Sequence, residues 1–262
     1  MIFPFLAIPL GLLIGVSLGA LGGGGSILTV PALVYVIGEN PRNATSASLV
    51  IVGVSALTGT IGHARSRRVR WGPGLVVGVV GIGGSLLGSH LNKLVNPNVL
   101  LLAFAGLMLL AAGAMLQRSA QPGSLQLSAP RAAGAGLTAK RLVEIAIVGT
   151  VVGFMTGFFG VGGGFVVVPG LVLALGFGMP EAVGTSLLVI ALNSMVALAA
   201  RGGVTALDWH VLIPFTAAAM AGSVVGGSVA ARVPAAALER SFAGLLVLVS
   251  VYTATKSILG LV

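Results

Sequence analysis

Two glycine-rich stretches of similar sequence interrupt two long apolar segments of the chain. The first, GGGGSILTVP, occupies residues 22–31, and the second, GVGGGFVVVP, occupies residues 160–169. The surrounding segments, Phe5 to Ile37 and Leu142 to Gly176, would each extend roughly 50 Å as one continuous helix, whereas the hydrocarbon core of a bilayer is about 30 Å thick. Each segment is therefore predicted to form two half-helices joined by irregular backbone.

The composition of the whole chain is that of a membrane protein. Of its 262 residues, 56% are hydrophobic and only 7% are charged, whereas soluble globular proteins carry about 25% charged residues. A surface with so few charges must mostly face lipid. The high apolar content excludes a disordered chain, and the absence of cysteine excludes both a disulfide scaffold and a cysteine nucleophile.

Further apolar windows are long enough to cross a bilayer, because a spanning helix needs about 20 apolar residues. Together with the two broken segments, they predict an all-α integral membrane protein, a polytopic helical bundle. The windows run from Asn43 to Gly62, Gly72 to Leu91, Asn98 to Gln117, Ala182 to Ala200, Val211 to Ala230 and Ser241 to about Thr255.

The second half of the chain repeats the first at a constant offset in residue number of 138, the offset between Trp71 and Trp209. Both glycine runs, each followed by a proline, fall in the same register. Chance apolar similarity would not align the tryptophans and the breaks at once. The predicted organisation is a first transmembrane repeat at 1–117, a cytoplasmic linker at 118–140 and a second transmembrane repeat at 141–262, each repeat with one broken helix and about three full spans.

Basic residues gather in the gaps between the apolar windows and contribute to a net charge of +9. One group lies between Arg65 and Arg70, and a second accompanies the linker, from Arg118 to Arg141. Retention of positive loops on the cytoplasmic side produces this distribution, so the two groups are expected on one side, and no nucleic-acid partner is expected. Parallel and inverted repeats place equal numbers of basic residues on the cytoplasmic side, so the sequence leaves the orientation of the halves open.

The glycine breaks are the predicted substrate site. Unwound backbone at membrane depth is tolerated only where it is buried in protein or lines a polar cavity. A helix that restarts after a break presents free N–H groups and the positive end of its dipole, which favour an anion. Paired interrupted segments in two halves indicate the substrate site of a transporter. The alternative is that the glycines merely allow close packing of helices.

Hydroxyl side chains follow each break, and Asn193 lies two turns further along the second helix of this kind. The hydroxyls can donate to an oxyanion or can cap and join helices, and the sequence does not choose between these roles. Asn193 is more suggestive, because an amide within a span needs partners or a wet cavity. The predicted substrate-binding residues are Gly24, Gly25, Ser26, Thr45, Ser46, Ser48, Gly162, Gly163, Gly164, Thr185, Ser186 and Asn193.

The sequence contains no recognisable catalytic or metal-binding constellation. No acidic or basic side chain lies centrally in a span, so a carboxylate proton relay is not expected. His63, His90 and His210 are too dispersed for a metal cluster and are expected at the membrane interface. We therefore expect no enzyme activity, no catalytic residue, no metal and no cofactor.

These features resemble the sulfite exporter TauE/SafE family, also called the toluene sulfonate uptake permease family. The resemblance covers nearly the whole chain outside the linker and rests on the glycine run before Pro169 and on the helix start AVGTSL at residues 182–187. The first repeat departs from the pattern, with GGGGS at residues 22–26 and ATSASL at residues 44–49. The resemblance implies a protein that moves small sulfur oxyanions or organosulfonates across the inner membrane.

The sequence thus predicts a secondary transporter that binds sulfite or an organosulfonate between two broken helices near the bilayer midplane. Its expected partners are this small anion and the lipid bilayer, with a proton as a candidate coupling ion. The direction of transport and the oligomeric state, including a homo-oligomer, are left open. The alternative is an anion channel or a non-transporting membrane scaffold, and a metal-ion permease is disfavoured because helix N-termini repel cations.

Overall fold

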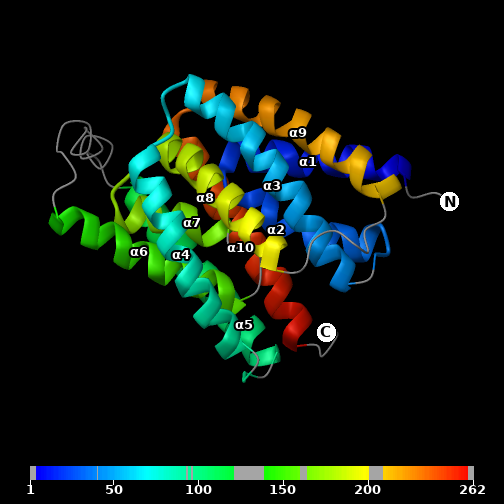
Figure 1. Ribbon diagram of the computed structural model, residues 1–262, viewed down its shortest axis with the longest axis horizontal. Helices are drawn as coiled ribbons and strands as arrows, with labels where there is room; N and C mark the ends of the chain where they lie inside the picture. Colours follow the sequence, from blue (N-terminus) through cyan, green and yellow to red (C-terminus); the bar gives the residue numbers. More distant parts are fainter. Residues whose placement is uncertain are drawn as a thin grey trace.

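The computed structural model describes residues 4–39, 41–92, 94–95, 97–120, 139–159, 164–200 and 209–258. All regular structure within these ranges is helical (Figure 1). The elements are α1 Pro4–Leu21, α2 Gly24–Pro31, π-helix η1 Ala32–Val36, α3 Pro41–Arg65, α4 Trp71–Asn92, α5 Pro97–Ala120, α6 Ala139–Phe159, α7 Gly164–Pro169, π-helix η2 Gly170–Ala174, α8 Met179–Ala200, α9 Trp209–Arg232 and α10 Ala235–Ile258.

Six helices in the described ranges, α3, α4, α6, α8, α9 and α10, are long and apolar enough to cross a membrane. The prediction of an all-α protein with several membrane spans is therefore confirmed. Five of the six predicted windows lie in these helices. The window from Asn98 to Gln117 lies in α5, whose recorded apolar part, Leu102–Arg118, is shorter.

Both long apolar segments are interrupted at the predicted places. In the first, α1 ends at Leu21 and α2 begins at Gly24. Gly22 between them has φ of +75°, a conformation that glycine adopts without the steric penalty of a side chain. In the second, α6 ends at Phe159 and α7 begins at Gly164. A π-helical segment follows the proline in each case, where the missing proline N–H interrupts the α-helical hydrogen-bond ladder.

Each interruption turns the chain back along the helix it has just left. A Cβ built on Gly25 would meet the carbonyl oxygen of Ile14 at 2.5 Å and the side chain of Leu18 at 2.7 Å, so α2 lies beside α1. A Cβ on Gly170 in η2 would likewise meet the side chain of Val152 in α6 at 2.6 Å. The broken segments are therefore hairpins and not continuous crossings.

Glycines allow two pairs of helices to pack at backbone distance. In the pair α1 and α9, a Cβ on Gly15 would overlap the backbone of Ala219, and a Cβ on Gly19 would overlap that of Ser223. The residue numbers rise together, so these helices run parallel. The pair α4 and α6 is parallel by the same criterion, with overlaps between Gly153 and Gly81 and between Gly157 and Ser85. Such close approach is typical of small residues at helix interfaces in membranes.

Helices α3 and α8, in contrast, run antiparallel through the middle of the bundle (Figure 1). Gly53 of α3 lies against Ser194 near the end of α8, whereas His63 near the end of α3 lies against Gly184 near the start of α8. The repeat predicted from the sequence pairs these two helices with each other, and parallel repeats would require them to run in the same direction. Their antiparallel course does not fit that arrangement.

Basic residues gather at one end of the bundle, where α3 ends and α4, α6 and α8 begin. This end, which we call the basic end, holds the turn at residues 65–70, Arg118 in the last turn of α5, and Lys140 and Arg141 at the start of α6. The start of α1 and the end of α10 lie at the opposite end (Figure 1). The two basic groups thus lie together, as expected from the sequence.

Hydrogen bonds tie the turn of the basic end to neighbouring helices. Arg70 forms an ion pair with Glu181 in the first turn of α8, with 2.7 Å between guanidinium nitrogen and carboxylate oxygen. Arg68 donates to the carbonyl oxygens of Ala230 and Ala231 near the C-terminus of α9, both at 3.4 Å. A cation at that position is also favoured by the helix dipole.

Candidate functional site

The starts of α2 and α7, which follow the two glycine runs, lie against each other inside the bundle. A Cβ built on Gly23 would overlap the carbonyl oxygen of Gly164, and a Cβ on Gly164 would overlap the hydroxyl of Ser26. The same position on Gly164 is 3.0 Å from the side chain of Ile190, in the middle of α8. The starts of α2 and α7 therefore meet without space for a side chain at either glycine.

The predicted serine hydroxyls bond to the backbone of their own helices. Ser26, Ser48 and Ser186 each donate to the carbonyl oxygen three residues earlier, at 2.7, 2.8 and 2.8 Å. The hydroxyl oxygen of Thr185 accepts a hydrogen bond from the backbone N–H of Arg70 at 3.0 Å. These bonds are the local side-chain to backbone type that competes with ligand binding. To donate to an anion, each serine would have to turn from its carbonyl partner.

The other predicted residues fall into three groups. Gly24 and Gly25 are buried where α2 packs on α1, and a Cβ on Gly24 would also meet Leu245 of α10 at 2.6 Å. Ser46 is half-buried on α3. Gly162 and Gly163 lie outside the described residues. Of the ten predicted residues that the structure describes, Thr45, Ser48 and Asn193 line the pocket described next.

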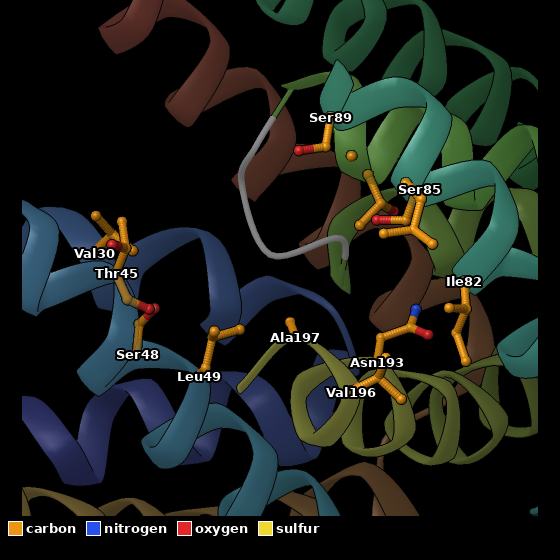
Figure 2. Close-up of a pocket in the computed structure, with 13 residues that line it drawn as sticks. Val30, Thr45, Ser48, Leu49, Ile82, Ser85, Ser89, Asn193, Val196 and Ala197 are labelled. Carbon is orange, nitrogen blue, oxygen red and sulfur yellow. The ribbon is translucent and has the colours of Figure 1, made fainter. Parts of the chain in front are cut away.

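This pocket has a volume of about 290 Å³ and lies mainly between α3, α4, α6 and α8. Figure 2 shows Thr45, Ser48 and Leu49 on one wall, and Ser85 and Ser89 on the facing wall. Its full lining is Val30, Thr45, Ser48, Leu49, Ile82, Ser85, Leu86, Ser89, Thr156, Gly157, Asn193, Val196 and Ala197.

The pocket lies in the half of the bundle away from the basic end. Its lining residues come from the early part of α3 and the later parts of α4, α6 and α8, and those ends point away from the basic turn. Leu86 is 65% exposed and Val196 is 39% exposed, and Ser89 is also exposed. The pocket therefore reaches the molecular surface in the half of the bundle away from the basic end.

The polar groups of the pocket are all uncharged. The lining residues offer the hydroxyls of Thr45, Ser48, Ser85, Ser89 and Thr156 and the amide of Asn193, among apolar side chains. The Oδ1 atom of Asn193 is buried and has no hydrogen-bond partner. An unpartnered buried amide atom is costly, which supports the expectation that this amide serves a cavity. A concave, mostly apolar surface with a few convergent polar groups is the usual form of a small-molecule site.

Sequence reasoning missed three hydroxyl residues of the pocket. Ser85 lies in register with Ser223 in the predicted repeat, which is a signal that could have been used. Ser89 and Thr156 carry no such signal, because a hydroxyl within a helix commonly bonds to its own backbone. Thr156 does so here, donating to the carbonyl oxygen of Val152 at 2.7 Å.

His63 lies in the last turn of α3 and is buried between helices, with only 2% of its surface exposed. Its expected depth at the membrane interface stays a prediction. Its Nε2 atom lies 2.9 Å from the carbonyl oxygen of Gly19 in α1. His90 and His210 are exposed.

Comparison with known proteins yields one family and several relatives. The family model described as sulfite exporter TauE/SafE matches residues 7–253. A probable membrane transporter protein of Xylella fastidiosa strain Temecula1 is 33% identical over 248 residues, which cover 94% of this chain and 92% of the relative. The probable membrane transporter protein YunE of Bacillus subtilis is 28% identical over 238 residues, which cover 86% of both chains. No solved structure matches the chain.

Proposed function

The chain belongs to the sulfite exporter TauE/SafE family, whose model matches residues 7–253, and from this premise we propose that it is a secondary transporter for sulfite or an organosulfonate. The family and the relatives establish a multi-pass membrane protein of a transporter type, with no catalytic function indicated. The proposal adds the substrate, the site and the mechanism. It also places the protein in the inner membrane with its basic end at the cytoplasmic face, as the retention of positive loops requires.

The pocket beside the two hairpins carries this proposal. Hydroxyl and amide groups of Thr45, Ser85, Thr156 and Asn193 surround a space open to one side of the bundle. Neutral donors of this kind can bind an oxyanion that must also be released, whereas a buried cation would hold it more strongly. The apolar side chains of the lining suit the carbon chain of an organosulfonate. Helices α2 and α6, which belong to the two broken segments, both contribute to its wall.

We propose further that the chain consists of two inverted repeats at residues 1–117 and 141–262, joined by a linker at 118–140. The spacing of the helices supports this organisation, because the starts of α5 at Pro97 and α10 at Ala235 differ by the offset of the sequence repeat. The antiparallel course of α3 and α8 supports the inverted form. Transporters built from inverted repeats with discontinuous helices bind substrate near the midplane and alternate between two open states.

A channel is the second candidate, and the packing of the described residues disfavours it. Gly22 at the first break is enclosed by Ser186, Val183 and Val168, which are all fully buried. An open channel would need a continuous passage from the pocket to the basic end. Close packing on one side of an open pocket instead suits a transporter that exposes one side at a time.

Uptake of labelled sulfite into proteoliposomes tests the proposal, with organosulfonates, sulfate and thiosulfate as competitors. Saturable uptake that an organosulfonate inhibits supports a transporter of this class. Uptake that rises linearly with sulfite and shows no competition would support a channel, and no uptake of any of these anions by correctly folded protein would contradict the proposed substrate.

Two threonines of α6 provide a matched pair for the site. Thr156 and Thr150 both donate to the carbonyl oxygen four residues earlier, at 2.7 and 2.9 Å, but only Thr156 lines the pocket. Thr156→Ala should raise the apparent KM for sulfite about three- to tenfold, the range of one net hydrogen bond. Thr150→Ala should leave it unchanged. Equal effects of the two variants would show that the pocket is not the substrate site.

A further inference from the structure

Under the proposed repeat, the residues that line the pocket are related to a second set of residues that lies toward the basic end. We call the region around this second set the counterpart of the pocket. The offset of the repeat relates Ser85 to Ser223 and Asn193 to Ser55. In the pocket, Ser85 of α4 and Asn193 of α8 both line an accessible space. At the related positions, the hydroxyl of Ser223 donates directly to the carbonyl oxygen of Ser55 at 2.9 Å. The same positions thus line a space in one case and are joined by a hydrogen bond in the other.

Side chains occupy the counterpart completely. Ser223, Ser55 and Leu187 are all 0% exposed, although Leu187 is related by the repeat to Leu49, which lines the pocket. A Cβ built on Gly59, the counterpart of Ala197, would lie 2.5 Å from the Ser223 hydroxyl oxygen and 3.0 Å from the side chain of Leu187. The described residues of the equivalent region are therefore buried and closely packed around Gly59 in this conformation.

His63 closes the counterpart on the side of the basic end. Its Nε2 atom is 2.9 Å from the carbonyl oxygen of Gly19, so α3 is held to α1. The same atom lies 3.4 Å from a Cβ built on Gly227, the counterpart of the exposed pocket residue Ser89. The ring of His63 thus occupies the position that would form the mouth of the second region.

The two regions share an unusual feature of their polar groups. The hydroxyl oxygen of Ser55 is buried and has no hydrogen-bond partner, and the Oδ1 atom of Asn193, at the same repeat position, has none either. Buried polar groups without partners are few in native proteins and destabilise the conformation that contains them. A ligand or water that reaches Ser55 when the region opens would remove this penalty.

We propose that the region around Ser55, Ser186 and Ser223 is a second substrate passage, which opens to the basic end in an alternative conformation and is closed here by His63. This proposal rests on the proposed transporter function. It assigns the residues through which the substrate would reach the basic end. The ligand is the same class of small oxyanion that the open pocket accepts. When the second passage opens, the pocket beside Asn193 should close in the corresponding way.

Single cysteines can test this directly, because the chain contains none of its own. Ser85→Cys reports on the pocket, and its repeat counterpart Ser223→Cys reports on the second passage. A membrane-impermeant methanethiosulfonate reagent is applied to one face of oriented vesicles at a time, and the rate of labelling is measured. In the parent background, we expect Ser85→Cys to react from the face opposite the basic end, and Ser223→Cys to react slowly and only from the basic face.

Substitution of His63 should change the labelling rates of the two cysteine reporters in opposite directions. With His63→Ala, we expect Ser223→Cys to react about three- to tenfold faster from the basic face, the range that loss of one hydrogen bond gives, and Ser85→Cys to react more slowly. His90→Ala, at an exposed histidine of α4, is the matched control and should change neither rate. Thr58→Cys, the counterpart of the pocket residue Val196, replaces Ser223→Cys as reporter where that variant fails to reach the membrane.

Two results would overturn the second passage. One is that the reporter on α9 or α3 stays unreactive from both faces in the His63→Ala background while Ser85→Cys reacts at its parental rate. The other is that the reporter reacts from the same face as Ser85→Cys. Labelling requires no substrate, so opposite changes in the two rates without sulfite uptake would contradict the proposed substrate alone. Saturable uptake with an unreactive reporter would contradict the second passage alone.

Discussion

The two ends of the helix bundle differ in packing, although the proposed repeat relates residues at one end to residues at the other. Toward the basic end, Leu187 and Ser223 are fully buried and in close contact with neighbouring helices. Toward the opposite end, Leu49 and Ser85, their counterparts under the proposed repeat, line an accessible pocket of about 290 Å³. The pair α1 with α9 and the pair α4 with α6, in contrast, pack in the same way through glycines.

This difference shows that one sequence pattern is compatible with both a closed and an open arrangement. Two conformations of similar free energy are what a transporter needs, because a substrate can only shift populations that are separated by a few kcal/mol. In the proposed mechanism, the close backbone contacts of the two helix pairs stay fixed, and the residues between the pairs rearrange.

The largest effect is expected from breaking the rigid helix pairs in both halves. Gly19 and Gly157 are counterparts under the proposed repeat, and a Cβ on either would overlap a backbone carbonyl oxygen of the partner helix. Gly19→Leu and Gly157→Leu should therefore each abolish the accumulation of folded protein, because overpacking against backbone exceeds the usual cost of about 1–3 kcal/mol.

Gly113→Leu is the control for these substitutions, since no atom lies within 4 Å of a Cβ at Gly113 in α5. Size-exclusion chromatography in detergent measures the folded fraction. Normal yield of one glycine variant and loss of the other would show that the two helix pairs are not equivalent.

An intermediate effect is expected from the two unpartnered polar positions. Asn193→Leu places an apolar side chain in the open pocket and should raise the apparent KM for sulfite more than tenfold, because it removes polar contacts and space together. Ser55→Ala removes a buried hydroxyl without a partner from the closed region and should raise the free energy of unfolding by about 1 kcal/mol.

Uptake assays and thermal unfolding in detergent measure these two outcomes. A loss of stability in Ser55→Ala would show that its hydroxyl is satisfied in the native protein. Unchanged KM in Asn193→Leu would remove the pocket from the transport path.

The smallest effect is expected from the ion pair at the basic end. The side chains of Arg70 and Glu181 are 24% and 33% exposed, so solvent screens their attraction. Glu181→Gln should lower the free energy of unfolding by at most about 1 kcal/mol and should leave the labelling face of both cysteine reporters unchanged. Glu144→Gln, at an exposed position of α6, serves as control. A reversal of the labelling face would mean that this ion pair, and not His63, holds the basic end closed.

Much of the fold follows from local features of the sequence. Apolar windows such as Val211 to Ala230 have the length and composition of spanning helices, and the glycine runs before Pro31 and Pro169 mark the interruptions. These features act through the chain itself, by helix length and by the conformational freedom of glycine. Parallel or inverted order could not be predicted, because both arrangements place the same number of basic residues on the cytoplasmic side. The antiparallel contact of α3 and α8 supports the inverted order proposed above.

The candidate site could be predicted only in part. Asn193 was identified because an amide within an apolar spanning helix needs hydrogen-bond partners or a wet cavity. It does line the pocket. Ser85 and Thr156 line the pocket because α4 packs on α6 through Gly81 and Gly153. No local sequence pattern specifies which two helices pack together in this way. Whether a helical hydroxyl faces a cavity or its own backbone likewise depends on neighbours distant in sequence.

The most direct test of the account is whether an anion stabilises the protein through the open pocket. Thermal unfolding of the parent and of Asn193→Leu is measured with increasing sulfite or an organosulfonate, with chloride at equal ionic strength as reference. The account predicts a saturable rise in the Tm of the parent, corresponding to about 2.7 kcal/mol at a hundredfold excess over Kd, and no rise in the variant. An equal rise in both proteins, or a rise in neither, would contradict the assignment of the pocket as the substrate site.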